Sequence, residues 1–189
     1  MKKLPKKYIV IGSIVAGIIL VFVLLTTVGK PLFSKNITAT KLADFRSVCY
    51  GDKIVNASAY TSNQSAVIAA FYEKPYGNDN PWTAVSGSTD DHYAQYSEFT
   101  KANVVACFEY QPFAGKQVAT CDDLKLKSAY YKTFFYEAKT GKKLAEGKEI
   151  VNDSATCPRY AVYDKLTKET AGVPGTAEMT TAIKTFVAQ

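Results

Sequence analysis

The chain opens with a short basic segment followed by a long apolar run. Residues 8–28, YIVIGSIVAGIILVFVLLTTV, carry no charged side chain. A helix rises about 1.5 Å per residue, so a run of this length crosses the roughly 30 Å hydrocarbon layer of a membrane. Four lysines precede the run and favour a cytoplasmic N-terminus: Lys2, Lys3, Lys6 and Lys7. We therefore expect a cytoplasmic tail at residues 1–7, one transmembrane helix at residues 8–28, and an outward-facing remainder.

A cleaved signal peptide is the alternative interpretation of this start. Thr27 and Gly29 are small residues placed before Lys30, as a cleavage site requires. The apolar part of a signal peptide is usually only about 7–15 residues long. The longer run here favours a retained signal-anchor in the cell membrane.

Small residues recur within the expected transmembrane helix. Gly12 and Ala16 are four positions apart, and so are Ser13 and Gly17. Such spacing puts small side chains on one side of a helix and lets a second helix approach closely. An oligomer formed through these residues is therefore a hypothesis, with ordinary membrane-helix composition as its alternative.

Beyond a tether at residues 29–39, the pattern predicts a β-rich domain at residues 40–189. Segments rich in Val, Ile, Tyr, Phe and Thr alternate with turn residues, and they predict strands at 54–60, 66–72, 103–111, 116–121, 129–138 and 142–151. Turns at residues 112–115 and 139–141 favour antiparallel hairpins. The strand at residues 129–138 has aromatic residues on both faces, so we expect it to be interior.

Helical periodicity is confined to the two ends of this domain. Thr40 is placed to cap a brief helical turn that carries Leu42 and Phe45. At the other end, Thr176 is placed to cap a helix whose apolar side chains fall on one face: Met179, Ile183, Phe186 and Val187. The predicted fold class is α+β, with one transmembrane helix followed by a mainly antiparallel sheet and a C-terminal helix that covers it.

Residues 74–100 interrupt the strand pattern with a long polar stretch. Loops of this length are uncommon and are usually functional or disordered. This one carries four aromatic residues that we take as the candidate binding residues: Tyr76, Trp82, Tyr93 and Tyr96. The alternative is that these side chains fold back to cover the core.

All four cysteines, Cys49, Cys107, Cys121 and Cys157, follow the apolar run. An even number on the outer side predicts two disulfides. A zinc site is the alternative, but the chain has no Cys-x-x-Cys pair and one histidine. A hairpin across residues 112–115 would bring Cys107 close to Cys121, which leaves Cys49 to pair with Cys157.

The distribution of charge argues against nucleic-acid binding. The formal net charge is +6, but four of the 23 basic residues precede the apolar run. The outer domain therefore has 19 basic against 17 acidic residues, a net charge of +2. Proteins that contact phosphates need a concentrated basic surface, and no such stripe is visible in this part of the sequence.

No pattern in the sequence predicts catalysis or a cofactor. His92 is the one available histidine base, and its neighbours Asp90 and Asp91 lie in the polar stretch with no identifiable nucleophile. The pair Asp122 and Asp123 is typical of solvated acids in a turn. Residues 78–80 lack the ordered ligand spacing of a calcium loop, and no glycine-rich phosphate loop occurs. We therefore expect a protein that is not an enzyme, with no metal and no cofactor.

Short motifs occur in a recognisable order along the domain: Val-Cys-Tyr-Gly at 48–51, Asn-Ala-Ser-Ala-Tyr at 56–60, Val-Val-Ala-Cys at 104–107, Glu-Ala-Lys-Thr-Gly-Lys at 137–142 and Cys-Pro at 157–158. In this order the chain resembles a group of uncharacterised bacterial extracytoplasmic β-rich domains with four cysteines. The resemblance covers most of residues 48–187. It implies a surface-anchored sheet with two bridges, and it implies no catalytic residue.

These observations favour a non-catalytic binding module, anchored at the membrane, whose ligand is a protein or a cell-envelope polymer. The alternative is a structural subunit of a membrane or filament assembly, joined through its N-terminal helix. A type IV pilin has the same general layout, although the Gly-Phe cleavage junction and the early glutamate of pilins are missing here. An extracytoplasmic enzyme is the third possibility.

Overall fold

The computed structural model describes most of the chain after the apolar run. The described residues are 34–75, 81–85, 92–112, 115–153, 156–157, 163–173 and 175–189. The expected cytoplasmic tail and transmembrane helix lie outside these ranges, and so do Gly12, Ser13, Ala16 and Gly17. Within the described ranges, no helix combines the length and the apolar character needed to cross a bilayer.

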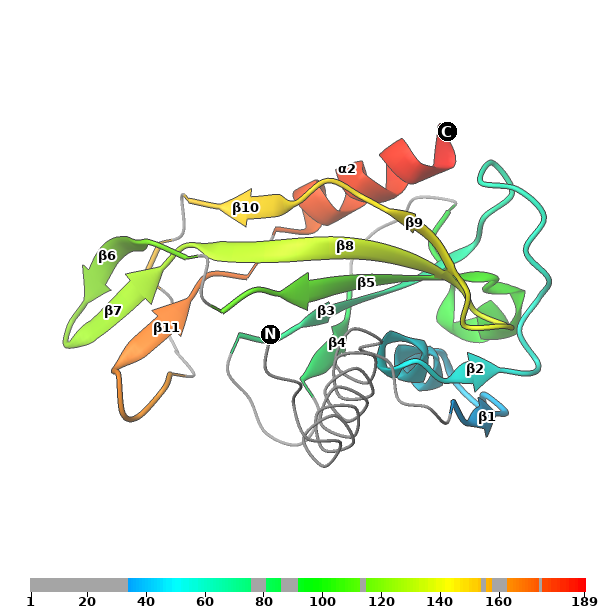
Figure 1. Cartoon of the computed structure of the whole chain (residues 1–189), viewed down its shortest axis with the longest axis horizontal. Helices are drawn as coiled ribbons and strands as arrows, with labels where there is room; N and C mark the ends of the chain where they lie inside the picture. The colour runs from blue at the N-terminus through cyan, green and yellow to red at the C-terminus, as the bar shows by residue number, and fades with distance from the viewer. Residues whose placement is uncertain are drawn as a thin grey trace, which may run out of the picture. The chain divides into compact units, whose positions relative to one another are not determined.

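The main sheet is built around two long neighbouring strands (Figure 1). Its spatial order is β10 (Ile150–Asn152), β8 (Ala129–Glu137), β5 (Val104–Tyr110), β3 (Ile68–Glu73) and β4 (Trp82–Ala84), with β9 (Lys143–Glu146) also beside β8. β8 pairs with β5 on one side and with β9 and β10 on the other. The prediction that residues 129–138 form an interior strand is therefore confirmed.

The sheet is mixed, so the expected mainly antiparallel arrangement holds only in part. β3 and β5 pair in parallel, with Ile68 opposite Val104 and Tyr72 opposite Phe108. A parallel pair needs a long connection that returns the chain to the same end of the sheet. Residues 74–103 provide this connection, and they include β4 and the 3₁₀ helix η2 (Tyr96–Lys101).

Two smaller sheets complete the strand topology. β6 (Gln117–Cys121) pairs with β7 (Leu124–Lys127), and β7 pairs in parallel with β11 (Glu169–Ala171). A second parallel pair joins β1 (Asn36–Ile37) and β2 (Lys53–Ile54). In Figure 1 the sheet of β6, β7 and β11 lies at the opposite end of β8 from β1 and β2.

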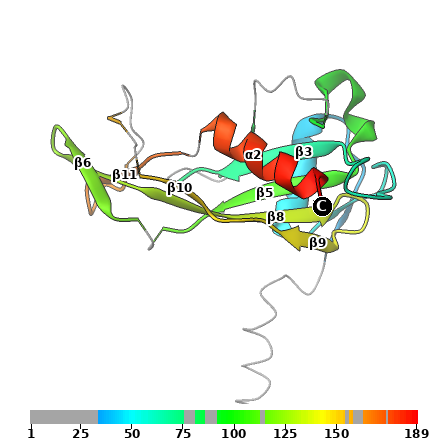
Figure 2. The same cartoon turned by 90° about the horizontal axis from the view of Figure 1, so that it is seen from above.

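The two faces of the main sheet are covered by different helices. On one face, α2 (Thr176–Val187) lies over the main sheet (Figure 2) and packs against inward residues of β8, β5 and β3. There the rings of Phe135 and Phe186 stack with centroids 4.1 Å apart. On the other face, Phe71, Val105 and Cys107 pack with the buried side of η1 (Leu42–Tyr50). α2 and η1 therefore each pack on a separate hydrophobic cluster, one on either face of the sheet.

Both predicted helices are present, and their starts differ slightly from the expected ones. α2 begins at Thr176 with Gly175 as its N-cap, and Met179, Ile183 and Phe186 are buried as their spacing predicted. η1 runs much further than a single turn. Its N-cap is Lys41, and Thr40 donates its hydroxyl proton to Asp44.

The strand predicted at residues 54–60 is wrong beyond Ile54, where β2 ends. The side chain of Asn56 bonds both backbone groups of Ala39, at 2.8 and 2.9 Å. Ser58 donates its hydroxyl to the carbonyl of Thr100. These hydrogen bonds reach residues 17 and 42 positions away and tie the segment to the start of η1 and the end of η2, so it connects elements instead of joining a sheet.

All four cysteines are in disulfides, as predicted, but the predicted pairing is wrong. Cys49 pairs with Cys107, and Cys121 pairs with Cys157. The expected hairpin between the strands of Cys107 and Cys121 does not form, because β5 lies between β3 and β8 while β6 pairs with β7. Cys107 instead points into the η1 cluster, where η1 carries Cys49. The bridges indicate that the domain lies in an oxidising, extracytoplasmic compartment.

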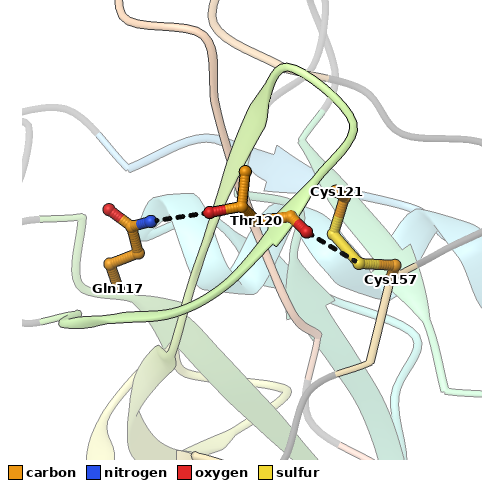
Figure 3. The surroundings of a disulfide bond; sticks show 4 residues. All are labelled: Gln117, Thr120, Cys121 and Cys157. Atoms are coloured by element: carbon orange, nitrogen blue, oxygen red, sulfur yellow. Dashed lines mark hydrogen bonds between the residues drawn. A yellow bond between two sulfur atoms is a disulfide. The ribbon is translucent and has the colours of Figure 1, made fainter.

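The two bridges differ in burial more than in loop length. Cys107 is only 2 % exposed, whereas Cys157 is exposed. Figure 3 shows the second bridge beside Thr120, whose carbonyl oxygen lies 3.8 Å from Sγ of Cys157. The sequence separations of 58 and 36 residues correspond to about 4 kcal/mol for each bridge on the chain-entropy model.

Removing each bridge separately should have different consequences. The double variant C49A/C107A should lose about 4 kcal/mol of unfolding free energy plus roughly 1–2 kcal/mol for the altered core. The variant C121A/C157A should show faster amide exchange confined to β6, β7 and β11. Urea unfolding and hydrogen exchange measure these effects. Linkage of a Cys49 peptide to Cys121 or Cys157 in non-reducing peptide mapping would contradict the pairing.

Candidate functional site

The structure does not bring the predicted aromatic binding residues together on one surface. Tyr76 lies outside the described residues. Trp82 is 7 % exposed in the η1 cluster, and Tyr93 is 6 % exposed in the α2 cluster, on the opposite face of the sheet. Tyr96 is 69 % exposed at the start of η2. Trp82 and Tyr93 therefore contribute to the two cores, which is the alternative that the sequence left open.

Contacts with neighbouring side chains fix both of these buried aromatic residues. The ring of Tyr50 meets Trp82 edge to face, with centroids 6.3 Å apart. The hydroxyl of Tyr93 lies 3.1 Å from Oγ1 of Thr180 on α2. These contacts connect the long segment between β3 and β5 to both covering helices.

The histidine and acidic residues that the sequence offered for catalysis or metal binding are also not brought together. His92 has its Nδ1 3.2 Å from the carbonyl oxygen of Ala66. Asp123 forms an ion pair with Lys168, which holds the pKa of the Asp123 carboxyl below its ordinary value. Among the described residues, no group of three histidine, cysteine or acidic side chains could hold a metal ion.

Among the described residues, a groove lies between α2 and the edge of the main sheet, and we call it the α2 groove. Its volume is about 390 Å³, near the lower end of the range for ligand sites. The stacked rings of Phe135 and Phe186 contribute to its lining. One wall is the continuous segment 145–151, and the other is a face of α2 formed by Glu178, Thr181, Ala182, Thr185 and Gln189.

The sheet-side wall of the α2 groove depends on a glycine. Gly147 lies between β9 and β10 in the chain. Its N–H donates to the carbonyl of Thr133 on β8 at 2.9 Å. A Cβ at this position would lie 3.1 Å from both Cβ and Cγ2 of Thr133, and 3.3 Å from the ring of Phe135. The absence of a side chain thus lets the wall pack directly onto β8.

The two threonines of the helix-side wall have no free hydroxyl proton. The hydroxyl of Thr181 donates to the carbonyl of Ala177, and that of Thr185 donates to the carbonyl of Thr181, both at 2.9 Å. Threonines that bond the preceding turn in this way have no hydroxyl proton left for a ligand. With Ala182 between them, they form a weakly polar stretch of this wall, between Glu178 and Gln189.

Charged side chains lie around the apolar lining of the α2 groove. The lining includes Glu146, Lys148, Glu149 and Glu178. Glu146 forms a 2.6 Å ion pair with Lys143, which lowers the pKa of its carboxyl. Glu149 and Glu178 are exposed, and neither takes part in an ion pair between described residues. The groove therefore combines an apolar floor with an acidic excess at its margin.

No protein-family model matches this chain, and neither does any curated protein or solved structure. The resemblance drawn from the short cysteine and hairpin motifs thus stays an expectation. The groove and the disulfides are the features of this domain that bear on its function.

The α2 groove was not predicted from the sequence, although α2 carries one usable signal. The spacing of Met179, Ile183, Phe186 and Val187 predicts one apolar face for the helix. Thr181, Ala182 and Thr185 form a second, weakly polar face beside it. A helix with two adjoining non-charged faces has more apolar surface than one sheet contact needs, and this excess is visible in the sequence.

A half-buried carboxyl on the opposite face gives a test of the η1 side of the domain. Glu73 lies opposite Trp82 in the β3–β4 pair and accepts the N–H of Tyr110 at 3.1 Å. Burial raises the pKa of Glu73 above its ordinary value of 4.5, and nearby Glu109 raises it further, while the Tyr110 N–H partly offsets the shift. The charged form is therefore disfavoured in the folded protein.

Stability should consequently fall as pH rises from about 4.5 through the folded pKa of Glu73, because the folded state holds this proton more tightly than the unfolded state. The variant Glu73→Gln keeps an acceptor for the Tyr110 N–H and has no charge to bury. Urea midpoints measured from pH 4 to pH 8 should show a flatter decline for this variant. Glu149→Gln is the matched control and should leave the slope unchanged; equal slopes in all three proteins would exclude this role for Glu73.

Proposed function

We propose that this protein is a membrane-anchored, extracytoplasmic, non-catalytic binding module whose ligand docks in the α2 groove. The observation that carries the proposal is the groove itself, with stacked Phe135 and Phe186 in its lining and few free hydrogen-bond donors on its helix side. The disulfides support the outer location, and the apolar run at residues 8–28 supports the anchor.

The chemistry of the groove favours binding over catalysis. Its lining contains no histidine, cysteine or serine that could act as a base or nucleophile. Its threonine hydroxyls already donate to the helix backbone. The carboxyl of Glu146 has a lowered pKa because Lys143 stabilises its charge, whereas a general acid near neutral pH needs a raised one.

The location is tested by protease added outside intact cells that make the full chain. Tags are placed at the N-terminus and in the exposed turn near Leu166, which is 95 % exposed. We expect loss of the turn tag and protection of the N-terminal tag, because the lysines before the apolar run hold that end inside. A mature protein that begins near Lys30 contradicts the anchor.

Use of the groove is tested by photo-cross-linking in the cells from which the chain derives. A photoreactive phenylalanine analogue replaces Thr185, which lines the groove, or Ala177, which is exposed on the same helix outside the lining. We expect a discrete adduct from position 185 and none from position 177. Adducts of equal yield at both positions, or at neither, would count against ligand binding in the groove.

A further inference from the structure

The sheet-side wall of the α2 groove is also an unpaired sheet edge. β9 and β10 pair with β8, and among the described residues no strand lies on their outer side. Val151 stands opposite Tyr130, and the carbonyl of Tyr130 faces β5, where it accepts the N–H of Gln111 at 2.8 Å. In an antiparallel pair this places the N–H and C=O of Val151 on the side away from β8.

An edge strand beside a helix is the geometry in which an extended peptide adds to a sheet. The peptide backbone bonds the edge, and alternate side chains enter the groove between strand and helix. Glu146 lies opposite Phe134 and Val151 lies opposite Tyr130, so this wall spans four residue steps of β8, about 13 Å at roughly 3.3 Å per residue. The helix wall from Glu178 to Gln189 spans about 17 Å at 1.5 Å per residue. The two walls therefore suit an extended segment of about four to five residues.

The charges of the groove restrict the sequence of such a segment. The lining holds three carboxylates and one ammonium group, and Lys143 balances only Glu146. Lys148 offsets one of the two other carboxylates, Glu149 and Glu178, so a net charge of −1 remains to favour cationic side chains and to repel anionic ones. The floor at Phe135 and Phe186 favours apolar side chains on the inward positions.

We propose that the α2 groove binds an extended segment of a partner protein, with apolar side chains at alternate positions and lysine or arginine between them, which adds as a strand to the edge at residues 146–151. This inference rests on the proposed function and names the ligand class of the same site. A second copy of the chain fits less well, because it would bring a second acidic margin to the first.

The experiment uses the full chain in phosphatidylcholine nanodiscs, with signals from empty nanodiscs subtracted. Fluorescence anisotropy measures the binding of three labelled hexapeptides: Lys-Val-Lys-Val-Lys-Val, its glutamate counterpart Glu-Val-Glu-Val-Glu-Val, and the block sequence Lys-Lys-Lys-Val-Val-Val. We expect the alternating lysine peptide to bind at least about tenfold more tightly than either control. Methylation of its backbone nitrogens on the edge-facing side should weaken binding by about tenfold or more, because strand addition needs these donors.

Variants of the chain assign this binding to the groove. Thr185→Trp, which fills the groove, should abolish peptide binding, while Ala177→Trp should not change it. The double variant E149Q/E178Q should weaken it by roughly three- to tenfold at low salt. Glu109→Gln neutralises an exposed carboxylate on the opposite face and should have no effect. Melting temperatures show whether each variant is folded.

The outcomes separate this inference from the proposed function. Equal binding of the lysine and glutamate peptides, or full binding after backbone methylation, overturns strand addition by a basic segment. A position-185 adduct that joins two copies of this chain also overturns it and leaves the groove as a self-association surface. Peptide binding that Thr185→Trp and E149Q/E178Q do not alter overturns it too, since the peptide then binds elsewhere.

Discussion

The burial of β5 on both faces is the constraint on which the rest of the domain depends. Residues 104–108 are each at most 2 % exposed, and their side chains alternate between the two hydrophobic clusters. A strand buried in this way needs a cover on each side. η1 is held to one face by the bridge from Cys49 to Cys107, and α2 is held to the other by the stacking of Phe135 on Phe186. The α2 groove lies where the second cover meets the edge of the sheet.

The elements of this fold were easier to predict from sequence than their pairing. Alternation and helical spacing identified the strands at residues 129–138 and 103–111 and the helix over Met179, Ile183 and Phe186, because these patterns report local burial. Pairing depends on where a chain returns after a long connection. The turn at residues 112–115 suggested a hairpin, and the same assumption led to the wrong partner for Cys107.

The candidate site shows the same limit more strongly. Trp82 and Tyr93 looked available for binding because they lie in a long polar segment, yet their rings are large enough that burial outweighs the polarity of their neighbours in sequence. The groove combines residues 145–151 with one face of α2, which are about thirty residues apart and share no motif. Tertiary packing brings them together, including that of Gly147 on Thr133 and of Phe186 on Phe135. A site of this kind is a property of the tertiary structure.

Because α2 is short, its stability depends on its packing beside the groove. A helix of twelve residues has little stability of its own in water and owes its persistence to tertiary packing. A partner that spans the groove adds contacts between this helix and the sheet edge only when the helix is docked. If the proposed partner binds, mass action makes the docked fraction of α2 rise with the free concentration of that partner. The same surface that recognises a partner would thus act as a sensor of its abundance.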